Sequence, residues 1–332
     1  MSADETVYLA GDVGATKTNL ALFTEEAGVR APLHEAGLLS GQFETLEDLV
    51  EAFLQGTEIR PVRAAFGVAG PVVEGQARIT NLPWHISEER LAERLSLERV
   101  DLLNDLVAVA ESVPILQSED VDTLNEGAPI ATGPIAVVAP GTGLGEAYLV
   151  RHEDGYHAYP SEGGHADFAP LDEEQMELLK YMQPKVGHVS YEYVCSGTGI
   201  AYLYRFLRDT GRVDVCSEVD AGISSAEQPT RAIFEHAFDA DPPVEICVET
   251  ARLFARILAA EAGNMALKVL SLGGVYLAGG LPPRMLPVLR EPFFMERFRE
   301  KGRFEKLVSR FPVHVVLNSK AALYGAAEHC RH

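Results

Sequence analysis

The chain has 332 residues, enough for two domains, and 47% of them are apolar, as in an ordinary globular enzyme. Its formal net charge of −21 argues against nucleic acid and anionic membranes as partners. The first ten residues are acidic and predict no signal peptide, and the longest uncharged stretch, 128–145, contains three prolines and cannot be a membrane helix.

The first half of the chain predicts strands that give way to alternating strands and helices. In chain order, we expect strands at 7–13, 19–23 and 33–39, a helix at 45–56, a buried strand within 62–73, a helix at 87–97, and a strand that runs into a helix over 100–110. Thr45 and Ser87 are the expected N-caps of the first two helices. This order predicts a mixed sheet with helices packed on it.

The second half repeats the layout of the first. The segment 133–150 reads as strand, glycine-rich turn and strand, like the start of the chain, and is the best candidate for an internal duplication. The further expected elements are helices at 173–182, 199–210 and 244–270, a strand within 273–284, a strand at 311–318 and a final helix at 319–330. The polar segment 213–229 is expected to be a loop.

The four cysteines indicate a compartment. They form no C-x-x-C pair and stand at no metal-like spacing with histidine: Cys195, Cys216, Cys247 and Cys330. Scattered cysteines in a chain of this length are typical of a reducing environment. We therefore expect a cytoplasmic protein.

The stretch GDVGATKTN, residues 11–19, places a carboxylate in a turn that otherwise suits a phosphate. It fits neither the Walker A nor the G-x-G-x-x-G spacing. Asp12 would repel a phosphate unless a divalent cation lay between them, and Mg²⁺ commonly uses one or two carboxylates plus phosphate oxygens. Gly14, Thr16 and Asn19 would then supply donors to the phosphate. The alternative is an ordinary hairpin turn with Asp and Asn as turn formers.

Two further glycine turns follow predicted strands. PGTGLG, residues 140–145, matches the first turn in layout, and its Thr142 is suited to donate to a γ-phosphate. LAGGLPPR, residues 277–284, offers bare backbone at Gly279 and Gly280 for a nucleotide base or sugar. Each stretch alone also fits a plain strand-end turn.

The stretch LLNDL, residues 102–106, puts an amide and a carboxylate inside an apolar run. Such groups need partners when buried. Either Asn104 and Asp105 cap a helix, or they line a polar pocket in which Asn104 donates to a substrate hydroxyl and Asp105 accepts its proton. The two roles are compatible.

Polyol recognition is suggested by two later stretches. SEGGHADFAP, residues 161–170, carries Glu162 and His165 around two glycines, and sugar hydroxyls need both donors and acceptors. A metal site is the rival interpretation, but these ligands lack a definite spacing. GHVSYEYVCSGTGI, residues 187–200, places Glu192 on a short helix and a glycine loop, suited to an anion or a ribose, before the next helix.

Taken in order, these six stretches resemble the bacterial ATP-dependent glucokinases of the non-ROK type. The resemblance spans nearly the whole chain. It implies the α/β, two-domain, actin-like ATPase (ribonuclease H-like) fold with the active site in the interdomain cleft. It also implies that the C-terminal helix returns to the small domain, so the expected domains are 1–108 plus 318–332, and 109–317.

The resemblance also implies roles for individual residues. Asp105 would be the catalytic base, and the sugar would be held by Asn104, Asp105, Glu162, His165 and Glu192. Asp12 would bind Mg²⁺ through water. The Mg-ATP phosphates and adenosine would be bound by Asp12, Gly14, Ala15, Thr16, Lys17, Gly141, Thr142, Gly143, Gly279 and Gly280. The chain departs from the family pattern at Ala15, where relatives have glycine, and at Lys17, which is more typical of ROK kinases, although the ROK cysteine-rich zinc motif is missing.

The implied activity is ATP-dependent phosphorylation of D-glucose at O6 to glucose 6-phosphate, the entry to glycolysis, with Mg²⁺ as cofactor. The expected partners are glucose and ATP, without nucleic acid or membrane, and the expected assembly is a homodimer. Two alternatives stay open: a kinase for another hexose or an amino sugar, and an actin-fold regulator that senses sugar without turnover.

Overall fold

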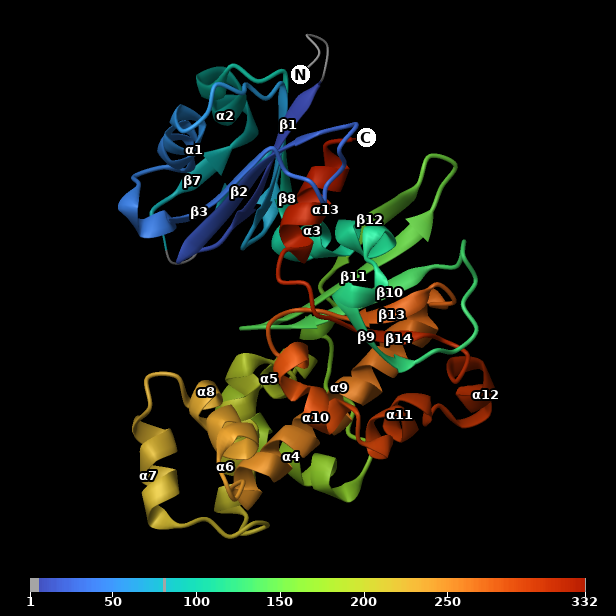
Figure 1. Ribbon diagram of the computed structural model, residues 1–332. Helices are drawn as coiled ribbons and strands as arrows, with labels where there is room; N and C mark the ends of the chain where they lie inside the picture. The colour runs from blue at the N-terminus through green and yellow to red at the C-terminus, as the bar shows by residue number, and fades with distance from the viewer. Residues whose placement is uncertain (1–5, 80–81, 332) are drawn as a thin grey trace. The chain divides into compact units, whose positions relative to one another are not determined.

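The computed structural model describes residues 6–79 and 82–331, which form two units (Figure 1). The first unit consists of Met1–Gln117, His152–Pro160 and Asn318–His332. The second consists of Ser118–Arg151 and Ser161–Leu317. Each unit is built on its own sheet and has its own core.

The sheet of the first unit has five strands in the order β3-β2-β1-β4-β8. β1 to β3, which match the three strands expected at the start of the chain, form an antiparallel meander, and β4 and β8 continue the sheet in parallel with β1. The strands are β1 (Val7–Val13), β2 (Lys17–Thr24), β3 (His34–Leu39), β4 (Arg63–Val68) and β8 (Arg99–Asn104). A small second sheet that we did not expect holds β5 (Val72–Val73), β6 (Gln76–Arg78) and β7 (His85–Ser87).

Helices cover both faces of the five-stranded sheet (Figure 1). Along β1, alternate residues point to opposite faces, as the period of a strand requires. Leu9 packs in one core with residues of α1 (Leu46–Gln55) and α2 (Glu88–Leu95). Tyr8 packs in the other with α13 (Ala321–His329), which lies against α3 (Asp105–Ser112).

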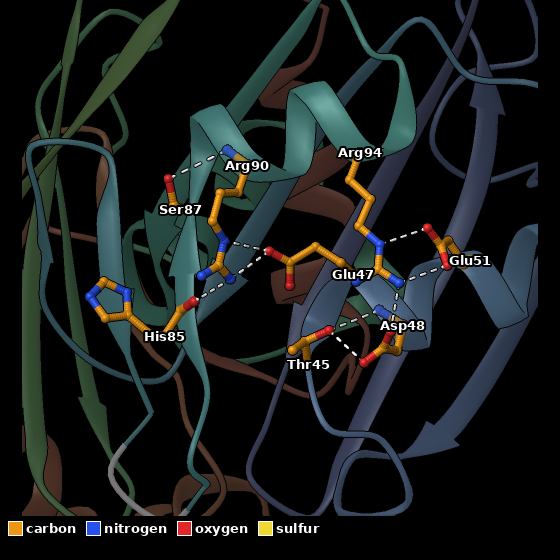
Figure 2. Close-up of polar contacts among 8 residues, drawn as sticks. All are labelled: Thr45, Glu47, Asp48, Glu51, His85, Ser87, Arg90 and Arg94. Atoms are coloured by element: carbon orange, nitrogen blue, oxygen red, sulfur yellow. Dashed lines mark hydrogen bonds and ion pairs between the residues drawn. The ribbon is translucent and has the colours of Figure 1, made fainter.

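The expected helix caps of α1 and α2 are present, and ion pairs join the two helices (Figure 2). Thr45 Oγ1 accepts from the N–H of Asp48 at 3.1 Å, and Ser87 Oγ accepts from the N–H of Arg90 at 3.5 Å. From α2, Arg90 reaches the buried carboxylate of Glu47 at 2.7 Å. Also from α2, Arg94 forms ion pairs with Asp48 at 2.6 Å and Glu51 at 2.8 Å near the surface.

Replacing Arg90 by Ala is expected to destabilise the first unit. The Glu47 side chain is only 3% exposed, and its Oε2 has no hydrogen-bond partner among the described residues. Removal of Arg90 leaves this charge without its cation, which typically costs about 1–3 kcal/mol. Urea unfolding of Arg90→Ala should show this loss, whereas Arg94→Ala, which breaks exposed pairs, should unfold near the wild-type midpoint. Equal losses in both variants would contradict the assignment.

Five strands of the second unit, β9, β10, β11, β13 and β14, belong to a six-stranded sheet with the order β12-β11-β10-β13-β14-β9. β10 and β11 form an antiparallel hairpin, and β13 and β14 follow in parallel with β10. The order β11-β10-β13-β14, with one antiparallel and two parallel pairings, is the same as that of β2-β1-β4-β8 in the first unit, which confirms the expected repeat. The strands are β9 (Val121–Asn125), β10 (Ile135–Pro140), β11 (Leu144–Arg151), β12 (Tyr156–Ser161), β13 (Gly274–Leu277) and β14 (Val313–Val316).

The long helix α9 (Glu245–Val269) packs on this sheet and is buried over most of its length, as its apolar sequence predicts. The other helices of the unit are α4 (Glu173–Val186), α5 (Tyr191–Val194), α6 (Gly197–Asp209), α7 (Ser217–Ser225), α8 (Pro229–Phe234), α10 (Leu286–Leu289), α11 (Pro292–Arg299) and α12 (Glu305–Val308). The loop expected at 213–229 is therefore wrong, because it contains α7. Only Ile223 of α7 is buried, so the helix shows no apolar stripe in the sequence.

The expected division of the chain needs one correction. The boundary placed between 108 and 109 falls inside α3, which is continuous from Asp105 to Ser112. The first unit runs on to Gln117 and also includes His152–Pro160. Residues from Asn318 onward belong to the first unit, as expected. Among the residues described, no helix has the length and apolarity needed to cross a membrane.

Candidate active site

In the first unit, the turn between β1 and β2 is held by a side chain from beyond β3. Within the turn, the N–H of Gly14 donates to the carbonyl of Lys17 at 3.1 Å. Ser40 braces it from the side: its hydroxyl donates to the carbonyl of Gly14 at 2.7 Å, and its N–H donates to the carbonyl of Thr16 at 3.1 Å. Ser40 is fully buried, so the turn rests on the core while Thr16 and Lys17 are exposed.

Asp12 lies within β1 rather than in the turn itself. It faces Asn19 of β2, whose Nδ2 donates to Asp12 Oδ2 at 3.4 Å. Gly37 pairs with Asn19 and Gly67 pairs with Asp12, so glycines flank this row on both sides. Burial, together with the charge of Asp105, raises the pKa of Asp12, and the bond from Asn19 lowers it. Asp12 and Asn19 thus lie opposite each other on paired strands, and the turn itself is formed by the residues between them.

Asn104 and Asp105 mark the junction of β8 and α3. Asn104 is the N-cap: its Oδ1 accepts from the N–H of Leu106 at 3.0 Å, and its Nδ2 donates to the carbonyl of Gly70 at 3.0 Å. Asp105 Oδ1 also accepts from the N–H of Leu106, at 2.9 Å. The residue is exposed, yet the protein packed around its carboxylate raises its pKa, and backbone N–H groups lower it. The capping role of Asn104 leaves one amide N–H for a ligand.

The donor set of the first unit fits a magnesium ion bound together with phosphates. Asp12 and Asp105 lie close enough for the charge of Asp105 to raise the pKa of Asp12. Among the residues described, no group of three or more His, Cys, Asp or Glu side chains forms a metal cage. Mg²⁺ in phosphate-transfer sites needs no such cage, because it keeps several waters and takes one or two carboxylates plus phosphate oxygens.

In the second unit, three glycine segments that are far apart in sequence come together. The carbonyl of Gly141, in the turn between β10 and β11, accepts from the N–H of Gly197 at the start of α6, at 2.7 Å. Gly279, after β13, has φ = +83° and packs on the carbonyl of Pro140, where a Cβ would lie 2.7 Å from that oxygen. Free backbone N–H groups at such turns suit phosphate oxygens. The carbonyl of Thr142 accepts from Thr198 Oγ1 at 3.4 Å, next to the same contact.

The polyol-type residues of this unit also form one group. His165 Nε2 lies 3.9 Å from Glu162 Oε2, and His165 Nδ1 lies 3.9 Å from Glu192 Oε1. Glu192 Oε2 accepts from the N–H of Leu144 at 3.0 Å, so this carboxylate is anchored to the glycine turn that precedes Leu144. The Glu162 side chain is 91% exposed, which leaves its acceptors available to a ligand.

Three side chains that support the glycine turns were not found by sequence reasoning. Ser40 braces the first turn, Ser196 caps α6 by accepting from the N–H of Gly199 at 3.1 Å, and Thr230 donates to the carbonyl of Gly197. Ser196 carried a signal, since it directly precedes a helix as an N-cap does. Ser40 and Thr230 act across 26 and 33 residues, and nothing local in the sequence marks them.

Comparison with known proteins identifies the family to which a chain with these turns and side chains belongs. The sequence profile of the glucokinase family matches residues 9–332. The chain is 40% identical over 339 residues to a glucokinase of Trichormus variabilis, with 97% of this chain and 98% of the relative covered. The chain belongs to the glucokinase family. This membership confirms the resemblance carried by the six motifs and the expected enzyme class, a transferase of the kinase type.

Solved glucokinases share the fold of this family member. A glucokinase from an Antarctic psychrotroph superimposes with a TM-score of 0.85 and is 31% identical, with 98% of both chains covered. A ROK family glucokinase from Streptomyces griseus, solved with glucose and AMPPNP, gives a TM-score of 0.60 at 18% identity, with 98% and 99% covered. These likenesses confirm the expected two-domain α/β sugar-kinase fold.

Proposed function

We propose that this member of the glucokinase family transfers the γ-phosphoryl group of ATP to the O6 hydroxyl of D-glucose. The observation that carries the proposal is the bond from the N–H of Leu144 to Glu192, because it joins a phosphate-type turn to a polyol-type group. A kinase must hold its acceptor hydroxyl and its phosphate donor in one fixed geometry, and such positioning supplies much of the rate.

Asp105 is the proposed base. The O6 oxygen forms a bond to the γ-phosphorus, the bond from that phosphorus to the β–γ bridging oxygen breaks, and the O6 proton passes to the Asp105 carboxylate. One oxygen of this carboxylate is held by the N–H of Leu106, which leaves the other oriented for the proton. Asn104, Glu162, His165 and Glu192 are the proposed ligands of the sugar hydroxyls.

The phosphates are assigned to the glycine turns of the two hairpins. In the first unit these are Gly14, Ala15, Thr16 and Lys17, and in the second they are Gly141, Thr142 and Gly143, with Gly279 and Gly280 near the adenosine. Asp12 would hold Mg²⁺ through its hydration shell. When bound, Mg²⁺ neutralises the charge that develops on the phosphoryl oxygens.

The proposed sugar site predicts a specificity. A site built to hydrogen-bond a hydroxyl rejects analogues that lack or misplace it, because its own polar groups are then left unpaired. We expect glucose to exceed galactose and 3-deoxyglucose by more than roughly tenfold in kcat/KM. N-acetylglucosamine should be a poor acceptor, since the loop of Glu162 and His165 would enclose C1 and C2. Competition kinetics with these sugars measure the order.

A coupled assay of ADP release with a panel of hexoses tests the activity itself. Turnover of glucose with Mg-ATP supports the proposal. A better rate with galactose or N-acetylglucosamine would make the protein a kinase of another sugar. Glucose binding without ADP release would favour a sugar-sensing regulator, and turnover with polyphosphate but not ATP would overturn the proposed donor.

The location and assembly follow from the same expectations. We place the enzyme in the cytoplasm, which agrees with four cysteines that are free in the structure. We propose a homodimer, which size-exclusion chromatography with light scattering checks against the monomer mass of 36.1 kDa. Glucose and ATP are its proposed partners.

A further inference from the structure

Glu146 of β11 is a buried carboxylate that the proposed reaction does not use. It pairs with Val138 of β10 and is fully shielded from solvent. Neither of its carboxylate oxygens has a hydrogen-bond partner among the described residues. An ionised carboxylate in such surroundings is strongly disfavoured, so Glu146 is expected to be a neutral acid in the folded protein.

Glu146 forms the floor of the loop that carries Glu162 and His165. The 3₁₀ turn η4 (Gly163–His165) lies directly on β11. A Cβ at Gly163 would overlap Glu146 Oε2, so a side chain at this position would require the carboxylate to shift. Gly164 packs equally closely on the carbonyl of Leu144. Any displacement of Glu146 toward the loop therefore shifts the proposed sugar ligands.

Glu146 also interacts with a buried charged cluster centred on Glu261 of α9. Glu261 of α9 is also fully buried, and its two oxygens accept from Asn264 Nδ2 at 3.0 Å and Lys268 Nζ at 3.2 Å. Lys301 Nζ donates to Asn264 Oδ1 at 2.7 Å and to the carbonyl of Ala260 at 2.9 Å. Among the described ion pairs, Lys268 belongs to Glu261, and none includes Glu146.

The charges of the cluster favour a proton on Glu146. Burial is the main cause and the charge of Glu261 the second, and together they raise the pKa of Glu146 to about 8, although Lys268 lowers it in part. The Tyr191 and Cys195 side chains close the cluster from α5 and the residue after it. Burial and the charge of Glu261 raise the pKa of both groups, so both stay protonated and neither adds a charge near Glu146.

We propose that Glu146 is a positioning residue for the sugar: as a neutral acid it supports the loop of Glu162 and His165 from below, and its ionisation displaces this loop and weakens sugar binding. The neutral acid donates its proton toward Glu261. Ionised Glu146 would repel Glu261 and so be driven toward the glycine turn that packs on its Oε2. The inference rests on the proposed function.

Isothermal titration of glucose without ATP, from pH 6.5 to 9.5, tests this inference apart from turnover. For the wild type we expect Kd to rise by roughly tenfold over this range. Glu146→Gln cannot ionise and keeps an N–H donor, so its Kd should change less than about twofold. The exposed Glu296→Gln serves as a matched control and should follow the wild type. At saturating glucose, kcat of Glu146→Gln should stay close to that of the wild type across this pH range, so the effect should appear in KM for glucose.

A thermal melt gives a second readout. Because the folded state keeps a proton on Glu146 that the unfolded state has released, the contribution of Glu146 to wild-type stability should fall as pH rises from about 4.5 to about 8. Glu146→Gln should therefore melt above the wild type at pH 8 and nearer to it at pH 5. A variant that is merely damaged would melt lower at every pH.

Glu261→Gln provides an independent variant should Glu146→Gln fold poorly. It removes the charge that helps to keep the proton on Glu146, so the loss of glucose affinity should begin at lower pH than in the wild type. Three results would overturn this inference but not the proposed function. Glucose binding by the wild type could be independent of pH, Kd could rise with pH in Glu146→Gln as it does in the wild type, or the loss of affinity in Glu261→Gln could begin at the same pH as in the wild type. A wild-type protein that binds no glucose at pH 6.5 overturns the proposed function and this inference with it.

Discussion

Replacing Asp105 by Asn is expected to lower kcat by at least roughly a hundredfold, the usual scale for losing a general base. Asn keeps the shape of the side chain and an oxygen that can accept from the N–H of Leu106, so the start of α3 should remain intact. Sugar affinity should stay close to the wild type, because Asn still offers polar atoms to a hydroxyl. Steady-state kinetics and glucose titration measure the two quantities separately.

The pH dependence of kcat/KM gives a second test of the assignment of Asp105 as the base. A base must be ionised to act, and the protein packed around the Asp105 carboxylate raises its pKa above the ordinary value of 3.8. Wild-type kcat/KM should therefore rise with pH through an inflection above that value, and the residual activity of Asp105→Asn should lack this rise. Asp101→Asn, on the same strand and paired with Arg99, is the matched control and should keep normal kcat. Near-normal turnover of Asp105→Asn would remove the residue from its assigned role.

Replacing Asp12 by Ala is expected to impair the use of Mg-ATP rather than of glucose. Groups that hold a metal through its outer shell typically contribute roughly 10–100-fold to metal affinity or activity. The Mg²⁺ concentration for half-maximal rate should increase by a comparable factor, while KM for glucose at saturating Mg-ATP changes little. A titration of Mg²⁺ at fixed ATP measures this shift.

Asp12→Asn separates charge from turn formation. The amide preserves the shape of the side chain and a partner for Asn19 across the hairpin, but it removes the negative charge. Because burial and the charge of Asp105 raise the pKa of Asp12, its ionised form is disfavoured in the fold, and neutral Asn should not lower the melting temperature at pH 7. If Asp12→Asn shows the Mg²⁺ dependence of the wild type, Asp12 is only a turn former.

Much of the candidate site could be predicted because its residues lie where a strand ends in a turn or a helix. Asn104 illustrates this: a polar pair inside an apolar run indicated both a cap and a pocket, and the structure shows the cap. Segment 213–229 shows the limit of such reasoning, because α7 buries only Ile223 and its sequence has no apolar period.

The sequence by itself determined the order of the longer strands and helices, one hairpin in each half of the chain, and the chemistry of each turn, because these depend on local periodicity and on glycine, Asp and Asn at turns. Only the tertiary structure decided which distant groups meet. The bond from Leu144 to Glu192 spans 48 residues, and Ser40 reaches Gly14 across 26. The burial of Glu146 beside Glu261 depends on how α9 packs on β10, and no local pattern in a sequence records that contact.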